Sequence, residues 1–302
     1  MIKVLKWLGI GLGALLGVIV IAVVVLLLLG RSRVNRSYNI QVETVAIPSD
    51  AASVQRGQHL VEAVVGCTGC HGTNLAGKKV FEEGPIGRVY APNITGGQGS
   101  ATGAYTDQDW ARAIRHGVSP KGKGLLIMPV EDYNNLSAED LGAIIAYLKA
   151  VPSVDNQTPK PDIRPLGRIL VALGAFGEVV PAQLVDHTAS LPGPVAPGVN
   201  VEYGGYLVSI SGCKGCHGKD LSGAQPPEPG APLAPNLTRG GHLGKWSEAE
   251  FIRTLRTGVE PDGEEMDAEF MPWEEYAKMT DEEMGAIWRY LLSLPAKEST
   301  AP

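Results

Sequence analysis

Cys67-Thr68-Gly69-Cys70-His71 and, further along the chain, Cys213-Lys214-Gly215-Cys216-His217 are the two stretches that decide the fold. C-x-x-C-H is the attachment signature of c-type haem. Two thiols one helical turn apart can each add to a vinyl group of the macrocycle, and the adjacent histidine then supplies a nitrogen ligand to the iron. All four cysteines of the chain lie in these motifs. The sequence therefore predicts two covalently bound haem c groups, attached at Cys67, Cys70, Cys213 and Cys216 and ligated by His71 and His217.

Two other uses of C-x-x-C fit the chain poorly. A zinc ribbon places its two C-x-x-C pairs about 15–20 residues apart, whereas well over a hundred residues separate these two. A thioredoxin-like motif needs a βαβ context, and the sequence shows none. Haem attachment is the interpretation that remains.

The surroundings of the motif also repeat, with a period of about 145 residues, which is the length of a duplicated domain rather than of a solenoid repeat. Ala-Pro-Asn-Ile-Thr at 91–95 matches Ala-Pro-Asn-Leu-Thr at 234–238, and a Met-Pro pair follows in both copies. Helical periodicity predicts helices over 53–66 and 203–212, then over 106–116 and 247–257. A last helix begins at Ser137 or Thr280 and ends before Pro152 or Pro295.

The second iron ligand is predicted from the repeat. Met128 and Met271 hold equivalent places, each before a proline in the loop that precedes the last helix. A thioether opposite the histidine closes the iron to exchangeable ligands and raises its potential, which suits electron transfer. We therefore expect Met128 and Met271 to be axial ligands.

Residues near each haem are also expected to have supporting roles. A ligating histidine usually donates its other N–H to a nearby oxygen, and the carbonyls of Pro92 and Pro235 are the candidates. Asn93 and Asn236 either bind haem propionates or form the turn. The four histidines without a repeat partner, at positions 59, 116, 187 and 242, are expected to be surface or capping residues.

The amino terminus carries a membrane anchor. Residues 7–30 form an uncharged run of 24 residues, long enough to span a bilayer. The run is longer than the apolar region of a signal peptide and lacks a small-residue cleavage site, so we expect it to stay attached. Two lysines precede it and three arginines follow it, so the positive-inside rule does not settle orientation. Because haem c is attached outside the bacterial cytoplasm, the bulk of the chain is expected on the periplasmic side of the inner membrane.

The order C-x-x-C-H, Ala-Pro-Asn, Met-Pro and closing helix resembles the class I cytochrome c fold, used twice. The resemblance implies an all-α protein, an N-terminal transmembrane helix followed by two tandem class I cytochrome c domains. The expected boundaries are anchor 1–36, tether 37–52, domains 53–152 and 200–296, Pro-rich linker 153–199 and tail 297–302. The chain is similar to the membrane-anchored cytochrome c subunits of bacterial dehydrogenases for gluconate and alcohols, but it has two motifs where many of these have three.

The charge of the second domain and the apolar stretch of the linker indicate what kinds of partner the protein has. Residues 200–296 carry 8 basic and 16 acidic residues, which disfavours nucleic acid and suits a basic protein partner. The acidic segment before Met271, residues 260–269, is either a docking loop for a basic carrier or a merely solvated loop. The apolar stretch 166–180 is either a helix packed across the two haem domains or a docking surface for a partner subunit or the membrane.

These features predict an electron-transfer protein rather than an enzyme, a dihaem cytochrome that passes single electrons within a respiratory or photosynthetic complex. Its expected partners are the membrane and other redox proteins or subunits. The alternative is a dihaem peroxidase-like enzyme, which needs an open iron position and acid–base groups above it. A methionine ligand at both irons argues against that alternative.

Overall fold

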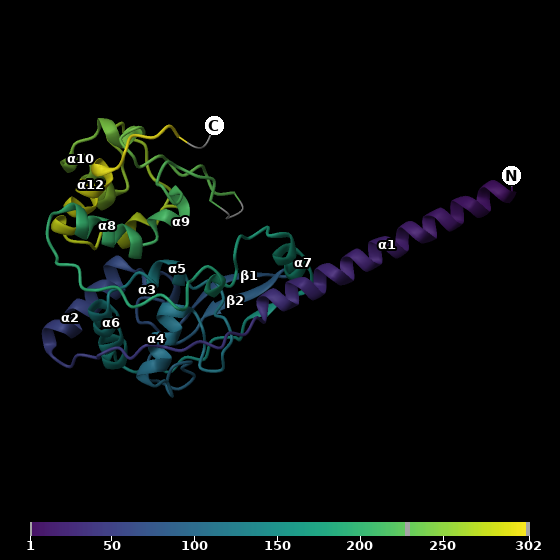
Figure 1. Ribbon diagram of the computed structural model, residues 1–302, viewed down its shortest axis with the longest axis horizontal. Helices are drawn as coiled ribbons and strands as arrows, with labels where there is room; N and C mark the ends of the chain where they lie inside the picture. Colours follow the sequence, from purple (N-terminus) through teal and green to yellow (C-terminus); the bar gives the residue numbers. More distant parts are fainter. Residues whose placement is uncertain (1, 227–229, 300–302) are drawn as a thin grey trace.

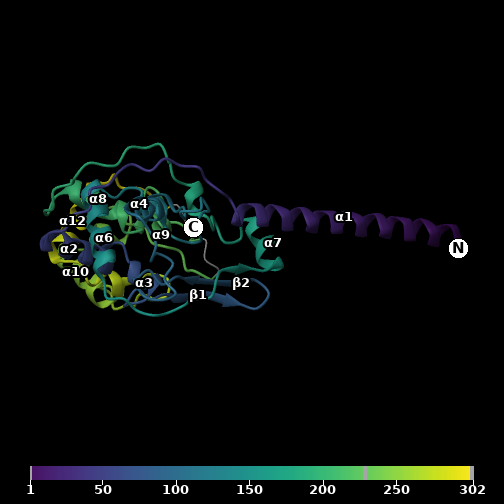
Figure 2. The ribbon, with the colours of Figure 1, turned by 90° about the horizontal axis from the view of Figure 1, so that it is seen from below.

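The computed structural model describes residues 2–226 and 230–299. A long helix, α1, projects from a body made of two lobes of short helices (Figure 1). The view from below shows the same arrangement, with helix α7 beside the inner end of α1 and helix α2 at the far end of the body (Figure 2). Residue 1 of the expected anchor and residues 300–302 of the expected tail lie outside the described residues.

Helix α1 spans Ile2–Val34 and carries no acidic residue. Among the described residues it is the one helix long and apolar enough to cross a membrane. Its leucine, valine and isoleucine side chains are largely exposed, and Gly30 is its one buried residue. An apolar helix of this length without a protein covering is suited to a bilayer, which supports the expected anchor.

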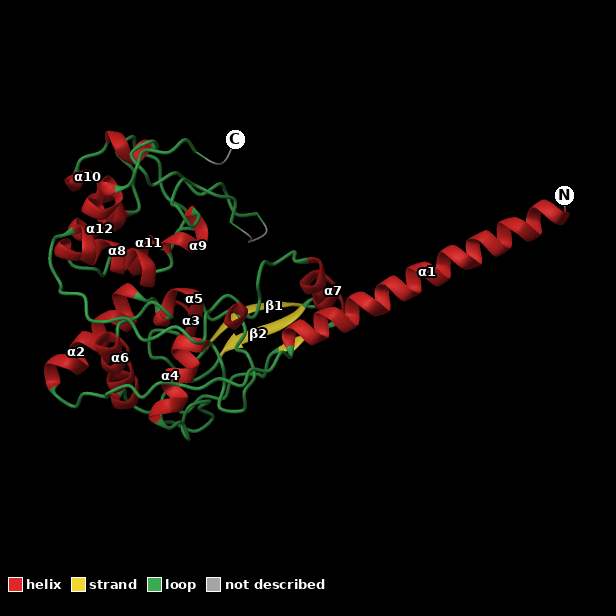
Figure 3. Cartoon of the chain, viewed as in Figure 1, coloured by secondary structure: helices red, strands yellow, loops and turns green. Residues whose placement is uncertain are grey.

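The two lobes contain the same succession of five α-helices, coloured red in Figure 3, and each has one further short helix, η1 or η3, at a different place in the order. The first lobe contains α2 Ala51–His59, η1 Leu60–Val64, α3 Cys67–His71, α4 Asp107–His116, α5 Val130–Tyr133 and α6 Ala138–Ala150. The second contains α8 Val201–Ile210, α9 Cys213–His217, η3 His242–Lys245, α10 Glu248–Thr257, α11 Trp273–Tyr276 and α12 Asp281–Ser293. The mostly helical fold with two repeated units is the one expected from the sequence.

In each lobe the first helix crosses the last at a glycine. A Cβ on Gly57 would lie 2.0 Å from the carbonyl oxygen of Ala143 in α6. In the second lobe a Cβ on Gly204 would lie 1.9 Å from the carbonyl oxygen of Ala286 in α12. The missing side chain lets the two backbones touch, so this pair of glycines sets the helix crossing that supports each C-x-x-C-H segment.

The starts of the last helices differ in one informative way. Thr280 and Glu283 form the capping box expected at α12, with each side chain accepting from the other residue's backbone N–H. Ser137 caps α6 in the same way, but Asp140 does not return the bond. Its carboxylate instead accepts two hydrogen bonds at 3.0 Å from Arg56 in α2.

A small sheet modifies the all-α expectation in the first lobe. Strands β1 Lys78–Glu83 and β2 Gly87–Ala91 form an antiparallel hairpin, and β3 Asp162–Ile163 adds to the free edge of β2. The third strand comes from the segment expected to be linker. A two-stranded hairpin is only marginally stable by itself, so the third strand stabilises it. Because that strand comes from a distant segment, local periodicity could not predict the pairing.

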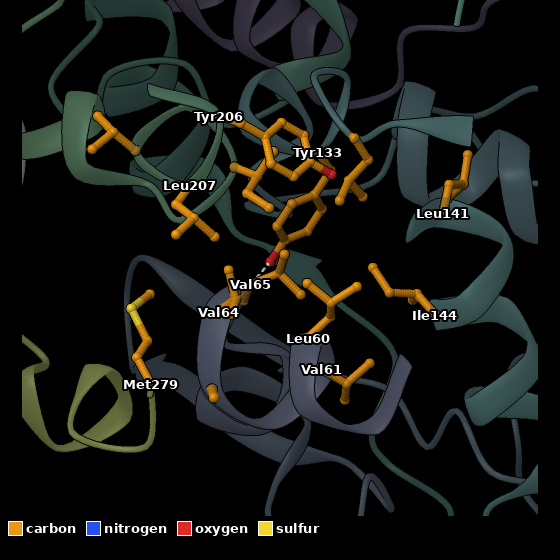
Figure 4. Packing of buried hydrophobic residues seen from close by; sticks show 14 of the residues in the cluster. Leu60, Val61, Val64, Val65, Tyr133, Leu141, Ile144, Tyr206, Leu207 and Met279 are labelled. Atoms are coloured by element: carbon orange, nitrogen blue, oxygen red, sulfur yellow. Dashed lines mark hydrogen bonds between the residues drawn. The ribbon is translucent and has the colours of Figure 1, made fainter. Parts of the chain in front are cut away.

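One hydrophobic core runs through both lobes. Figure 4 shows Met279 and Leu207 of the second lobe beside Val64 and Leu60 of the first, with Tyr133 and Tyr206 above them. The lobes therefore pack as one body, although each has its own pair of crossing helices.

Polar side chains also join the lobes. Glu283 of α12 is buried and accepts from His59 at 2.7 Å and from Arg56 at 3.4 Å, both in the first lobe. Tyr206 donates to Asp140 across the same interface at 2.8 Å. The interface is thus specified by a connected hydrogen-bond network as well as by apolar contact.

The linker corrects one expectation. Its helix, α7 Pro165–Leu173, does not pack across the two haem domains; it lies along the end of α1. Helical periodicity shows that a helix has an apolar face, but the partner of that face depends on the path of the flanking chain. Here β3 places the start of α7 beside the hairpin, and α7 then runs along α1.

The predicted tether is packed rather than free. The backbone N–H of Tyr38 donates to the carbonyl of Gly122 at 2.7 Å, and Lys123 donates to the carbonyl of Asn35 and to Ser37. Val45 is buried in the main core. The segment after α1 therefore ties the first lobe closely to the anchor.

Candidate haem sites

The first C-x-x-C-H segment forms a single helical turn, α3, between two glycines with positive φ. Gly66 has φ 63° and Gly72 has φ 81°, a conformation that residues with a side chain rarely adopt. The second segment, α9, is bracketed in the same way by Gly212 and Gly218. The glycines confine the helix to the motif itself, so the cysteines and the histidine are presented together.

Both motif histidines are oriented by a proline carbonyl. Nδ1 of His71 lies 2.8 Å from the carbonyl oxygen of Pro92, and Nδ1 of His217 lies 2.8 Å from that of Pro235. A carbonyl can only accept, so Nδ1 carries the proton and Nε2 keeps its lone pair. Burial lowers the pKa of both histidines, which favours this neutral form. Each ring is therefore set to offer Nε2 to a metal.

A cavity of about 610 Å³ lies beside α3 in the first lobe. Its lining includes Cys67, Cys70, His71 and Met128. Apolar side chains from the hairpin and from α4 and α6 complete much of the wall. Burial raises the pKa of Cys67 to about 12, as expected for a thiol surrounded by apolar groups. The volume is in the range of cofactor pockets, and its chemistry suits a large apolar plate.

The methionine loops have the same backbone shape in both lobes. The carbonyl of Met128 accepts from the N–H of Val130 at 2.8 Å, and that of Met271 accepts from Trp273 at 2.7 Å. The intervening Pro129 has φ −78° and ψ 64°, which defines an inverse γ-turn. Pro272 has nearly the same angles, φ −76° and ψ 59°. The repeat seen in the sequence is thus a repeat of local geometry at the two candidate ligands.

The two asparagines form turns rather than sites for a propionate. Oδ1 of Asn93 accepts from both the N–H and the hydroxyl of Thr95, and its Nδ2 donates to Val154 and Asn156 carbonyls. Asn236 repeats this pattern, with Nδ2 donating to the carbonyl of Lys297. Both ends of each buried amide are already engaged by the protein. Of the two roles expected from the sequence, the structure favours the turn.

The segment that accepts hydrogen bonds from Asn93, at Val154 and Asn156, continues into residues that cover part of the first cavity. Residues 157–161, which the sequence placed in the linker, line that cavity. Asn156 also donates to the carbonyl of Ala76 at 2.7 Å. Sequence reasoning missed this cover because the segment lies after the helix-ending Pro152. The only sign of this segment in the sequence was the repeated Asn-x-Thr pattern at 93–95 and 236–238, whose asparagines bind it or its counterpart.

Three of the four histidines that have no equivalent in the repeat are not ordinary surface residues. His59 binds Glu283 across the lobe interface. His116 is buried and its Nδ1 lies 3.1 Å from Nδ1 of His187, which comes from the linker. Burial lowers the pKa of His116 to about 4, helped by nearby positive charges. These side chains hold the lobes and the linker together, and their distant partners could not be predicted from their own surroundings in sequence.

The lobe interface brings the two motifs into reciprocal contact. Thr68, inside the first motif, donates to Glu275 of α11 at 3.2 Å. At the equivalent place in the second lobe, Oδ2 of Asp132 of α5 lies 3.5 Å from where a Cβ on Gly212, the residue directly before the second motif, would be. Each motif thus meets the short helix that follows the other lobe's methionine.

Two equivalent tyrosines, one in each lobe, bind the backbone next to these contacts. Tyr133 donates to the carbonyl of Val65 at 2.8 Å, and Tyr276 donates to that of Ser211 at 2.7 Å. Each carbonyl lies just before a C-x-x-C-H motif. Burial raises the pKa of both hydroxyls well above its usual value, so both stay neutral. Each of these bonds lies within one lobe, so each tyrosine holds the short helix after the methionine against the C-x-x-C-H segment of its own lobe.

Paired thiols beside a histidine with a bare Nε2, an apolar cavity and a methionine in the same wall fit a covalently attached haem. The arrangement defines the class of the protein, a c-type cytochrome built from two domains. The comparison with known families agrees: the family described as cytochrome c matches residues 54–152 and again residues 201–295. The chain belongs to the cytochrome c family.

Several characterised proteins are similar to most of the chain. The gluconate 2-dehydrogenase cytochrome c subunit of Pantoea cypripedii is 32% identical over 286 residues, covering 82% of this chain and 61% of the relative. The fructose dehydrogenase cytochrome subunit of Gluconobacter japonicus is 29% identical over 279 residues, covering 81% and 53%. A diheme cytochrome c-type of Cereibacter sphaeroides is 26% identical over 257 residues, covering 77% and 83%. The chain thus spans only about half to three fifths of the two dehydrogenase subunits.

Proposed function

We propose that the protein is a dihaem electron-transfer subunit, anchored by α1, that carries single electrons from a dehydrogenase on the periplasmic face of a bacterial inner membrane. The observation that carries the proposal is the duplicated site, with a His–Pro carbonyl bond of 2.8 Å and a Met-Pro turn in each lobe. Haem, when bound, supplies the one-electron chemistry. The chain supplies the attachment cysteines, the ligands His71, Met128, His217 and Met271, and the surfaces that place the two sites.

The reciprocal interface supports transfer between the two sites. Thr68 donates to Glu275, and the Asp132 carboxylate lies beside Gly212, so each attachment segment lies against the other lobe. Because the lobes share one core, this relation is fixed and needs no domain movement. We infer that electrons cross between the lobes at this interface.

The second lobe offers the surface for a soluble carrier. Residues 262–265 and 267–269 before Met271 are exposed, and Glu260 has a raised pKa because of burial and the neighbouring charges of Asp262 and Glu264. The equivalent loop in the first lobe, residues 119–124, carries Lys121 and Lys123 and no acidic residue, and Lys123 donates to Asn35 and Ser37 in the segment that follows α1. The acidic loop is therefore the one left available for a basic partner.

The charge of this loop can be tested directly. Neutralising Glu264, Glu265 and Asp267 together should slow electron transfer to a basic carrier about tenfold at low salt, because long-range steering would be lost. The difference should vanish at high salt, where the charges are screened. Neutralising three exposed acidic residues elsewhere, Glu83, Glu139 and Glu202, is the matched control. An unchanged rate and salt dependence would remove the docking role from the loop.

The subunit role is tested by gentle solubilisation of native membranes, separation on a native gel stained for haem, and mass spectrometry of the band. Migration with dehydrogenase subunits supports the proposal. Migration alone, together with rapid cyanide binding and peroxide turnover by the resting protein, would overturn it, because methionine-ligated iron is closed to such ligands.

A further inference from the structure

Helix α7 is fixed to the end of the membrane anchor. A Cβ on Gly30 of α1 would lie 1.9 Å from the carbonyl oxygen of Arg168, so the two backbones touch. Arg33 of α1 donates to the carbonyls of Val171 at 2.9 Å and Ala172 at 3.1 Å, at the last turn of α7. Backbone contact and a cationic cap at the helix end hold α7 in one position along α1.

One face of α7 is left uncovered by the part of the chain that the structure describes. Leu166 is 42% exposed and Leu173 is 63% exposed. They are seven residues apart and so share one face of the helix. Half-buried Ile169 and Leu170 lie between them in the sequence, and the helix contains no acidic residue. Leu26 and Leu27, on the side of α1 that Gly30 turns toward α7, are half-buried, so the apolar surface of the anchor adjoins α7.

The depth of the contact follows from helix length. A bilayer core takes about 20 helical residues. Counted from Trp7, an aromatic residue of the type found at membrane interfaces, these residues reach about Leu26. The contact with α7 at Gly30 and Arg33 therefore lies where the outer hydrocarbon boundary gives way to headgroups.

The charges beside α7 suit anionic headgroups. Arg31 and Arg33 belong to the last turn of α1, and Arg164 directly precedes α7. Of the acidic groups in this region, Asp162 pairs with Arg164 at 3.4 Å and Glu178 accepts from Gln183, while Glu82, which accepts from Tyr90, and Glu83 lie on β1 of the hairpin. Basic residues next to a bilayer are attracted to the headgroups of an anionic leaflet.

From the continuous apolar face, its depth and its basic rim we propose that α7 is a second membrane contact. It lies in the interface of the outer leaflet, with Leu166 and Leu173 toward the acyl chains and the arginines among the phosphates. The occupant of this surface is the lipid bilayer itself rather than a protein subunit.

The contact would set the height of the first lobe over the membrane. A Cβ on Gly167 of α7 would lie 2.1 Å from the carbonyl oxygen of Ile86, at the tip of the β1–β2 hairpin. That hairpin supplies Val80 and Val89 to the wall of the first haem cavity. Through the hairpin, α7 holds the first site close to the membrane surface, within reach of a membrane-embedded redox partner.

A photo-crosslinking residue, p-benzoylphenylalanine, placed at Leu173 of the full-length protein in native membranes tests the proposal. We expect phospholipid adducts by mass spectrometry, and at least threefold more of them in vesicles containing an anionic phospholipid than in vesicles of phosphatidylcholine alone. The same residue at Leu166 provides an independent position should the first variant fold poorly. The control is exposed Gln58 on α2, at the far end of the body (Figure 2), where no lipid adduct is expected.

Other outcomes would overturn the inference. Adducts to a protein subunit at both Leu166 and Leu173 would assign the face to a partner chain. Absence of any adduct at both positions, in a protein whose α1 remains membrane-inserted, would show that the face points into water. Neither result bears on electron transfer by the two haem sites, so it would leave the proposed function standing.

Discussion

Replacing Glu283 with glutamine should loosen the two lobes from each other. Glu283 is 4% exposed and accepts from His59 at 2.7 Å, from Arg56 at 3.4 Å and from the N–H of Thr280 at 2.9 Å. Glutamine can still close the capping box at Thr280, so the substitution removes the charge while keeping the helix start. The effect is therefore confined to the contacts that cross between lobes.

The magnitude follows from those contacts. Breaking a fully buried ion pair costs about 3–5 kcal/mol. Here the side chains of Arg56 and His59 are 27% and 29% exposed, and Arg56 retains Asp140, so water and a second carboxylate absorb part of the loss. A hydrogen bond to a charged group contributes about 1.5–3 kcal/mol, and we expect a loss of about 2 kcal/mol at pH 7.

The effect depends on pH. Burial raises the pKa of Glu283, but the hydrogen bonds from His59 and Thr280 outweigh it and leave the pKa below its usual value. A carboxyl with a depressed folded pKa stabilises the protein above its unfolded pKa of about 4.3 and loses that contribution as the pH falls through the folded pKa. The difference between wild type and Glu283→Gln should therefore shrink below about pH 4.

Urea unfolding of the haem-loaded protein, followed through the haem bands and the tryptophan fluorescence, measures the change. Wild type should unfold in one transition because the lobes share a core, and the variant should show a lower midpoint or two separated transitions. Glu282→Gln, on the exposed side of the same turn, is the control and should change stability by less than about 0.5 kcal/mol. Equal behaviour of the two variants at pH 7 would refute the view that Glu283 couples the lobes.

Two further substitutions test other parts of the fold. Gly57→Ala should destabilise the first lobe by more than about 2 kcal/mol in urea unfolding because the new Cβ would meet the carbonyl of Ala143 at 2.0 Å, whereas Gly84→Ala, with open space, should have little effect; similar costs for both would disprove the close crossing. Burial, with the neighbouring charge of Glu131, raises the pKa of Asp132 to about 7, so ionisation opposes folding as the pH rises above the unfolded pKa of about 3.9. Asp132→Asn should then exceed wild type in stability at pH 8 by at least about 1.4 kcal/mol and match it near pH 4, and a gain that is the same at both pH values would exclude this cause.

The two haem motifs and their helices were readable because their information is local. Five consecutive residues carry both thiols and the histidine, and the glycines that confine α3 and α9 adjoin them. The capping box at Thr280 depends on a residue three positions further on. The ends of α6 and α12 depend on the prolines that follow within two residues, Pro152 and Pro295. Duplication added a second line of inference, because Met128 and Met271 stood out from the other methionines only by sharing a place in the repeat.

The sequence by itself thus determined the cofactor motifs, the repeated helical units and the long apolar helix α1, all of which follow from spacing and composition within short windows. Only the tertiary structure decided how α7 lies on α1, how residues 157–161 cover the first cavity, and how Glu283 joins the lobes. The hydrogen bonds that fix these arrangements join residues about 60 to more than 200 positions apart. Their side chains gain stability only when distant segments meet, and no local pattern records which segment that will be.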